Sequence, residues 1–213
     1  MTFIDNLAIE LDALILVTVA VFYTGVWVWW GLRKGDAKEA NASLRGGGAV
    51  LGILGGFLLL LGLWGEFTWP LPASYNMLFY DPTVLVGVIL VGFAATLWFK
   101  IPSHLVGVIA FVSGWGVIYY GARAYLLGLT TEPLDMFAMY MAFGALAVLS
   151  FPTTLFVDWY VTRTQTLGSS PTSSYPKMWN YALGLFLLFA VLAGIASILM
   201  GFNAVWSHLA RAP

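Results

Sequence analysis

The stretch LGILGGFLLLLGLWG, residues 51–65, contains no charged side chain. A continuous apolar run of this kind predicts a helix that crosses a lipid bilayer, because a spanning helix needs about 20 mainly apolar residues. A transmembrane β-barrel would instead show segments of about ten residues with alternating polarity. The run and its flanking residues therefore predict an α-helical membrane span over 49–69.

Similar apolar segments lie on both sides of this run. The six predicted spans are Leu11–Trp30, Ala49–Trp69, Pro82–Phe99, His104–Leu127, Leu134–Tyr160 and Trp179–Trp206. Between the third and fourth spans, Pro102 disfavours helix at the residue before it and Ser103 is a typical helix N-cap, so we expect a tight turn there. The sequence thus predicts an all-α integral membrane protein, residues 1–213, built as a single bundle of six transmembrane helices.

The composition agrees with a lipid environment and excludes several other classes of protein. Hydrophobic residues make up 61% of the chain and charged residues only 9%, whereas a soluble domain has about 25% charged residues. The formal net charge of −1 provides no electrostatic basis for binding nucleic acid. The absence of cysteine excludes iron–sulfur clusters, thiolate zinc sites and cysteine nucleophiles.

Basic residues are concentrated in alternate connections between the predicted spans. These residues are Arg33, Lys34, Lys38, Arg45, Lys100, Arg163 and Lys177, and only Arg123 and Arg211 lie on the other side. Because Lys and Arg favour the cytoplasmic side, we expect both termini outside and a multi-pass protein of the cell membrane. The N-terminal segment begins with acidic rather than basic residues, so we expect no cleaved signal peptide.

Two connections on the predicted inner side differ in composition. Residues 31–48, GLRKGDAKEANASLRGGG, mix charges with small residues and are interpreted as a solvated connection. The segment TQTLGSSPTSSYPK is rich in Ser, Thr and Pro, so a mobile linker is predicted over about 164–178.

The second span is unusually rich in glycine. Gly48, Gly52 and Gly56 are spaced four residues apart, and small residues at this spacing let a neighbouring helix approach closely. Two interpretations stay open. The helix is either buried within the bundle, or its glycine face contacts a second copy of the chain or a partner in a membrane complex.

The two histidines are predicted at opposite faces of the membrane. His104 lies at the inner end of the fourth span and His208 beyond the outer end of the sixth. They cannot jointly ligate one haem or metal ion across a core of about 30 Å, which excludes a bis-His haem. A single histidine with a Met or water partner stays open as a ligand, so no metal site is predicted and the cofactor is left undefined. The motifs HExxH and GxSxG and the dinucleotide fingerprint are absent, and no catalytic residue is predicted.

Charged residues near the outer ends of the spans form the predicted outer polar cluster. Its members are Glu10, Asp12, Glu66, Arg123 and Asp135. An unpaired charge near hydrocarbon is expensive, so we expect Arg123 to approach at least one of these carboxylates. A pair of Arg123 with Glu66 is interpreted either as a structural link or as part of a polar vestibule for a cation, a basic group or a quinol headgroup.

The run Ser150-Phe151-Pro152-Thr153-Thr154 lies near the middle of the fifth span. Pro152 has no N–H to donate to the carbonyl of Val148, so we expect a helix kink at which nearby hydroxyls satisfy the freed groups. Broken helices mark substrate sites in many transporters. Passive kinks are also common, and both interpretations stay open.

The run GFLLLLGLWGEFTWPLPASYNMLFYDPTVLVGVIL, residues 56–90, resembles a family of archaeal and bacterial membrane proteins known as domain of unknown function 981. The resemblance is carried by a GLxxxxTWPL-type phrase at 62–71 and by an N-x-x-F-x-D-P phrase at 76–82, and it covers 46–98. It implies an uncharacterised multi-spanning protein and assigns no activity. It draws attention to Thr68, Trp69, Asn76 and Asp81 in the outer loop phrase.

The sequence favours a non-catalytic role. The first prediction is a protein that binds or translocates a small solute or cation through an acidic outer vestibule. The alternative is an accessory subunit of a membrane complex of respiratory type. A membrane enzyme ranks last because neither a nucleophile nor a set of metal ligands is recognisable in the sequence.

Overall fold

The computed structural model describes residues 6–72, 74–130, 132–167 and 177–209. Within these ranges the chain forms six α-helices. Their bounds are α1 Asn6–Lys34, α2 Ala37–Thr68, α3 Ser74–Phe99, α4 His104–Leu127, α5 Pro133–Leu167 and α6 Lys177–Leu209. Each helix is long and apolar enough to cross a membrane. The predicted all-α fold with six spanning helices is confirmed.

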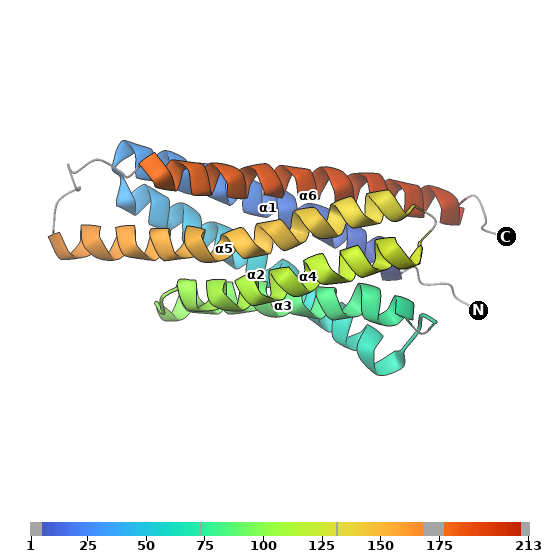
Figure 1. The fold of residues 1–213 in the computed structure, drawn as a ribbon. Helices are drawn as coiled ribbons and strands as arrows, with labels where there is room; N and C mark the ends of the chain where they lie inside the picture. Colours follow the sequence, from blue (N-terminus) through green and yellow to red (C-terminus); the bar gives the residue numbers. More distant parts are fainter. Residues whose placement is uncertain (1–5, 73, 131, 168–176, 210–213) are drawn as a thin grey trace.

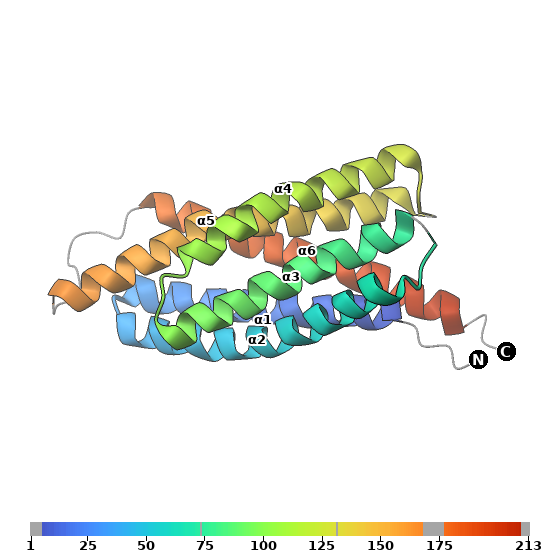
Figure 2. The same ribbon diagram turned by 90° about the horizontal axis from the view of Figure 1, so that it is seen from below.

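The six helices form a ring that follows the order of the sequence (Figure 1). Each helix packs against the next, and α6 closes the ring by packing against α1. The most extensive contacts join α2 to α3 and α4 to α5, whereas α3 meets α4 at few residues. Figure 2 shows the α2–α3 and α4–α5 hairpins on opposite sides of the bundle. The α3–α4 contact is therefore the loosest seam between neighbouring helices of the ring.

Glycine accounts for the tight packing of both hairpins. A Cβ atom at Gly62 of α2 would lie 2.9 Å from the backbone nitrogen of Val84 in α3. A Cβ atom at Gly114 of α4 would lie 2.6 Å from the carbonyl oxygen of Gly144 in α5. Such close approach of two helix backbones is possible only without side chains at the contact. The glycine face of the second span is thus largely buried against α3 of the same chain.

The first connection is much shorter than the solvated loop expected over 31–48. Only Gly35 and Asp36 interrupt the helical backbone between α1 and α2. Gly35 has a φ angle of 74°, which glycine adopts readily because it has no Cβ atom. The Asp36 carboxylate accepts a hydrogen bond of 2.9 Å from the backbone N–H of Glu39 and so caps α2. A glycine and a capping aspartate are therefore enough to reverse the chain.

The third helix begins before the predicted span, so Pro82 lies inside α3 rather than at its start. Pro82 has no N–H for the carbonyl of Leu78, four residues earlier. The hydroxyl of Tyr140 in α5 donates a hydrogen bond to this carbonyl instead. A tertiary contact thus replaces the missing helical bond, and the helix continues through the proline.

The predicted N-cap at Ser103 is wrong in its chemistry, although α4 begins where it was expected. The backbone of Ser103 has helical dihedral angles, and its side chain makes no capping bond. Its hydroxyl donates to Asp158 of α5 at 2.9 Å, and the same carboxylate accepts the backbone N–H of His104 at 2.7 Å. A carboxylate stabilises the positive end of a helix dipole, so Asp158 caps α4 from the neighbouring helix.

The two ends of the ring differ in charge. The end with the α1–α2 and α3–α4 connections, here called the basic end, contains Arg33, Lys34, Lys38, Arg45 and Lys100. The other end, called the acidic end, holds the start of α1, the end of α6 and the acids Glu10, Asp12, Glu66, Asp81 and Asp135. Which end faces the cytoplasm stays a prediction.

The predicted linker over about 164–178 is described by the structure only at its two ends. Its first residues, 164–167, continue α5, and residues 177 and 178 begin α6. The remainder of this predicted linker, 168–176, lies outside the described residues.

Candidate functional site

All six helices border one partly open cavity of about 120 Å³. Each helix contributes at least one lining residue, and examples in chain order are Val21, Leu51, Phe93, Ala110, Thr153 and Phe186. The cavity lies in the half of the ring nearer the basic end, because Ser103, directly before α4, is also part of the lining. Its walls are almost entirely apolar. A ring of helices with one loose seam has thus left a space that its side chains do not fill.

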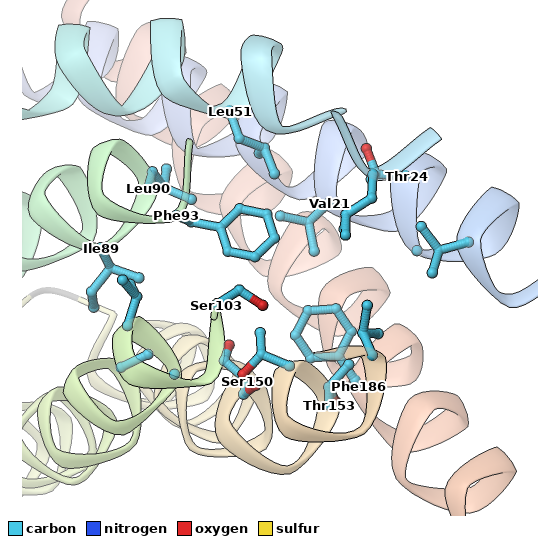
Figure 3. Close-up of a pocket in the computed structure, with 18 of the residues that line it drawn as sticks. Val21, Thr24, Leu51, Ile89, Leu90, Phe93, Ser103, Ser150, Thr153 and Phe186 are labelled. Atoms are coloured by element: carbon cyan, nitrogen blue, oxygen red, sulfur yellow. Dashed lines mark hydrogen bonds between the residues drawn. The ribbon is translucent and has the colours of Figure 1, made fainter. Parts of the chain in front are cut away.

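Hydroxyl groups provide the few polar atoms near this cavity. Figure 3 shows Ser103, Ser150 and Thr153 around the same space as the rings of Phe93 and Phe186. Ser150 donates to the carbonyl of Leu146 within α5 at 3.0 Å, and Ser103 donates to Asp158. Thr153 differs from both, because its Oγ1 atom is buried without a hydrogen-bond partner among the described residues.

The unpartnered hydroxyl follows from the local sequence of α5. Pro152 lies inside the helix, and Thr154 next to it donates to the carbonyl of Ser150 at 2.7 Å. Thr153 is among the residues that line the cavity, and only 8% of the residue is exposed. A buried hydroxyl without a partner costs about 1–3 kcal/mol. The cavity therefore adjoins a buried hydroxyl that the described residues leave without a partner.

Interhelical hydrogen bonds join the polar residues nearer the acidic end. The Thr83 hydroxyl in α3 donates to the Glu10 carboxylate in α1, and the Tyr120 hydroxyl in α4 donates to Asp81 in α3. The carboxyl group of Glu66 lies beside that of Asp81. Glu10 is only 4% exposed. These contacts bring together residues from four helices.

The predicted outer polar cluster is only partly assembled. Glu10 and Glu66 take part in these contacts, whereas Asp12, Arg123 and Asp135 are exposed. The ion pair expected between Arg123 and Glu66 is not formed: the one ion pair among the described residues joins His104 to Asp158 at 2.9 Å. Tyr120, one helical turn before Arg123, faces inward and supplies the partner for Asp81. The sequence could not show which face of α4 points inward.

The outer loop phrase holds the turn between α2 and α3. Thr68 donates to the carbonyl of Trp64 at 2.7 Å, and Trp69 ends α2 in a left-handed conformation with a φ angle of 48°. Asn76 is fully buried, donates to the carbonyl of Gly65 at 3.2 Å and accepts the backbone N–H of Leu71 at 3.3 Å. Thr68, Trp69 and Asn76 therefore have a structural role in shaping the turn. Asp81 is the one residue of the outer loop phrase that takes part in the interhelical polar contacts described above.

A second, polar pocket of about 510 Å³ lies at the basic end between α2, α3 and α5. Arg45, Lys100 and Asp158 are among its lining residues. The sequence analysis did not single out this pocket. The signal in the sequence was Lys100 near Pro102, but only the fold brings Arg45 and Asp158 to the same place. Among the side chains that the structure describes, no three His, Asp or Glu residues form a group that could hold a metal ion.

The fold defines an all-helical protein whose six helices are each long and apolar enough to cross a membrane, with an apolar cavity among them. The chain belongs to the family described as Protein of unknown function (DUF981), whose model matches residues 1–211. The predicted family membership is confirmed, and the match extends well beyond residues 46–98. Neither a search of curated proteins nor a search of solved structures found a match.

Proposed function

We propose that this protein binds a small, mainly apolar solute inside its ring of helices. The observation that carries the proposal is the apolar cavity of about 120 Å³, whose lining includes Thr153 with its unpartnered hydroxyl. An engineered cavity of about 150 Å³ in another protein binds benzene, so the size suits a ring or a short chain. A polar atom on the solute would give Thr153 its missing hydrogen bond.

The proposal moves the expected solute site from the acidic end to the opposite half of the ring. Ligand sites in proteins are mostly apolar chambers with a few polar atoms that orient the ligand. The cavity has this character, and it lies beside Pro152, where the sequence suggested a substrate site. A cell-membrane location with both termini outside is part of the same proposal.

The experiment uses the absence of natural cysteines. Cysteine is introduced by Ser150→Cys at the cavity, or by Leu155→Cys at an exposed position of the same helix. Benzyl alcohol, an apolar ring with one hydroxyl, should slow modification of the thiol at position 150 by methyl methanethiosulfonate several-fold and saturably. The thiol at position 155 should react at an unchanged rate. Equal slowing at both positions would mean that the alcohol acts through the detergent, and the proposal would be wrong.

A second candidate function is cation binding at the acidic end. Glu10 Oε2 and Glu66 Oε1 are buried side-chain oxygens without a hydrogen-bond partner among the described residues. Carboxylate oxygens are ligands that hard cations prefer. Uptake of sodium ions into proteoliposomes, reduced by Glu66→Gln but not by Asp12→Asn at an exposed position, would support this function. Uptake that both variants leave unchanged would exclude it.

The accessory-subunit alternative places a partner against α2. Gly46 and Gly56 have open space where a Cβ atom would lie, so a helix of a second copy or of another subunit fits there by size. Stable co-purification of a partner, lost in Gly56→Leu, would favour this alternative. A purified chain that runs as a monomer and binds benzyl alcohol would favour solute binding.

A further inference from the structure

The apolar cavity and the polar pocket at the basic end adjoin each other. Leu44 of α2 and Val157 of α5 line both spaces. One space is apolar and lies among the helices, and the other is polar and lies at the end of the ring. Together they have the polarity of a molecule with an apolar chain and a polar head.

The charges of the polar pocket favour an anion. Arg45 and Lys100 line it, and neither forms an ion pair within the described part of the chain. The carboxylate in the lining, Asp158, already accepts hydrogen bonds from the Ser103 hydroxyl and the His104 backbone N–H, and it contacts His104 Nδ1 at 2.9 Å. The pocket is therefore lined by two cationic side chains without an ion pair and by one carboxylate that is already hydrogen-bonded.

The backbone at Lys100 adds to this picture. Lys100 follows α3 with a φ angle of 58°, and the backbone N–H of Ile101 bonds the carbonyl of Thr96 at 2.9 Å. This is the helix-ending motif in which glycine is the preferred residue, because other residues are strained in the left-handed region. Lysine at this position keeps an ammonium group at the pocket despite the strain.

We propose that the two spaces together bind an anionic membrane lipid, with its phosphate between Arg45 and Lys100 and part of one acyl chain in the cavity. Basic pockets between helices at the cytoplasmic end are suited to anionic headgroups. In this proposal the lipid chain enters between α3 and α4, the neighbouring helices with the least extensive contact. The chain part of this inference rests on the proposed binding of an apolar solute, whereas the headgroup part does not.

The test compares two lipids with the same chains and different heads. Native mass spectrometry of the purified full chain measures binding of dioleoyl phosphatidylglycerol, dioleoyl phosphatidylcholine and inorganic phosphate. The anionic lipid should bind one to one and at least tenfold more tightly than the zwitterionic lipid. Lys100→Gly and Arg45→Gln should each remove about tenfold of the affinity for the anionic lipid and should leave the zwitterionic lipid unaffected.

Lys100→Gly separates a binding defect from a folding defect. Because glycine relieves the strain at this position, the variant should melt at a higher temperature while it binds the anionic lipid less tightly. Lys38→Gln is the matched control, since Lys38 is an exposed lysine at the same end that does not line the pocket. An equal loss of affinity in Lys38→Gln would show diffuse surface attraction and overturn the proposal.

The different measurements of this test also distinguish a failure of this inference from a failure of the proposed function. Equal binding of the two lipids would overturn the headgroup site, while protection by benzyl alcohol would still support solute binding. Tight binding of inorganic phosphate that competes with the anionic lipid would show an ion site and overturn the role of the chain. Thr153→Leu, which fills the cavity, should weaken the binding of both lipids. Unchanged binding of both lipids would overturn the placement of the acyl chain in the cavity.

Discussion

The two sides of α3 differ in how they pack. On one side, Gly87 lies so close to α2 that a Cβ atom there would be 2.6 Å from the backbone nitrogen of Leu59. On the other side, Gly92 faces α4 with ordinary spacing, and a Cβ atom would lie 3.5 Å from the side chain of Val106. The first seam joins two helix backbones directly, and the second adjoins the cavity.

The loose side of α3 also differs along its length. Nearer the acidic end, hydrogen bonds cross from α3 to Tyr120 of α4 and to Tyr140 of α5. Nearer the basic end, the cross-helix bonds that the structure describes join α4 to α5 and α1 to α6, through Asp158 and through Trp29 with Asn180. The interhelical hydrogen bonds of α3 that the structure describes thus lie nearer the acidic end, whereas both proposed binding spaces lie nearer the basic end.

The largest expected effect tests the tight side of α3. Gly87→Ala should lower the free energy of unfolding by about 3 kcal/mol, because the added methyl group must push the α2 backbone away. Gly92→Ala, on the same helix, should change stability by less than about 1 kcal/mol and in the stabilising direction, because alanine is the better helix former. Thermal unfolding in detergent measures both. Similar losses in the two variants would show that the seams are equally tight.

A smaller effect is expected at the bonded end of the loose side. Tyr140→Phe removes the hydroxyl that donates to the Leu78 carbonyl, the carbonyl that Pro82 cannot bond. The free energy of unfolding should fall by about 2 kcal/mol because that carbonyl is left without a partner. Tyr119→Phe is the control, since Tyr119 is 65% exposed. If the two variants unfold at the same temperature, the Tyr140–Leu78 hydrogen bond does not stabilise the contact between α3 and α5.

The smallest effect is expected in the cavity. Thr153→Val keeps the shape of the side chain and removes the unpartnered hydroxyl, so it should stabilise the empty protein by about 1 kcal/mol. The same change should weaken the protection by benzyl alcohol at position 150. A destabilised Thr153→Val variant would mean that the hydroxyl has a partner in the protein in solution.

Much of the fold could be predicted because membrane spans are a property of local composition. Any 20-residue apolar segment must form its own hydrogen bonds in a bilayer, and a helix does so without help from the rest of the chain. The turn at 35–36 and the path of α3 through Pro82 were missed, since a capping carboxylate and a tyrosine from another helix supply the missing bonds.

The candidate site was predictable only in part. The sequence pointed to the run around Pro152 and to Glu10, Glu66 and Asp81, because a proline in a span and an acid near hydrocarbon are unusual by themselves. The sequence analysis expected Arg123 to pair with Glu66. In the structure Glu66 lies beside Asp81, and Asp81 accepts a hydrogen bond from the Tyr120 hydroxyl. Helix rotation decides such pairs, and in a nearly uniform apolar helix the sequence does not fix the rotation.

The sequence alone determined that this chain is a six-helix membrane protein of its family, with basic residues gathered at one end, because length, hydropathy and charge act within each segment. Only the tertiary structure decided which side of each helix faces inward. It placed most of the glycines of α2 against α3, left a cavity beside the loose seam and brought Arg45 and Lys100 to one pocket. Packing between distant segments fixes these contacts, and it depends on the shapes of all six helices together.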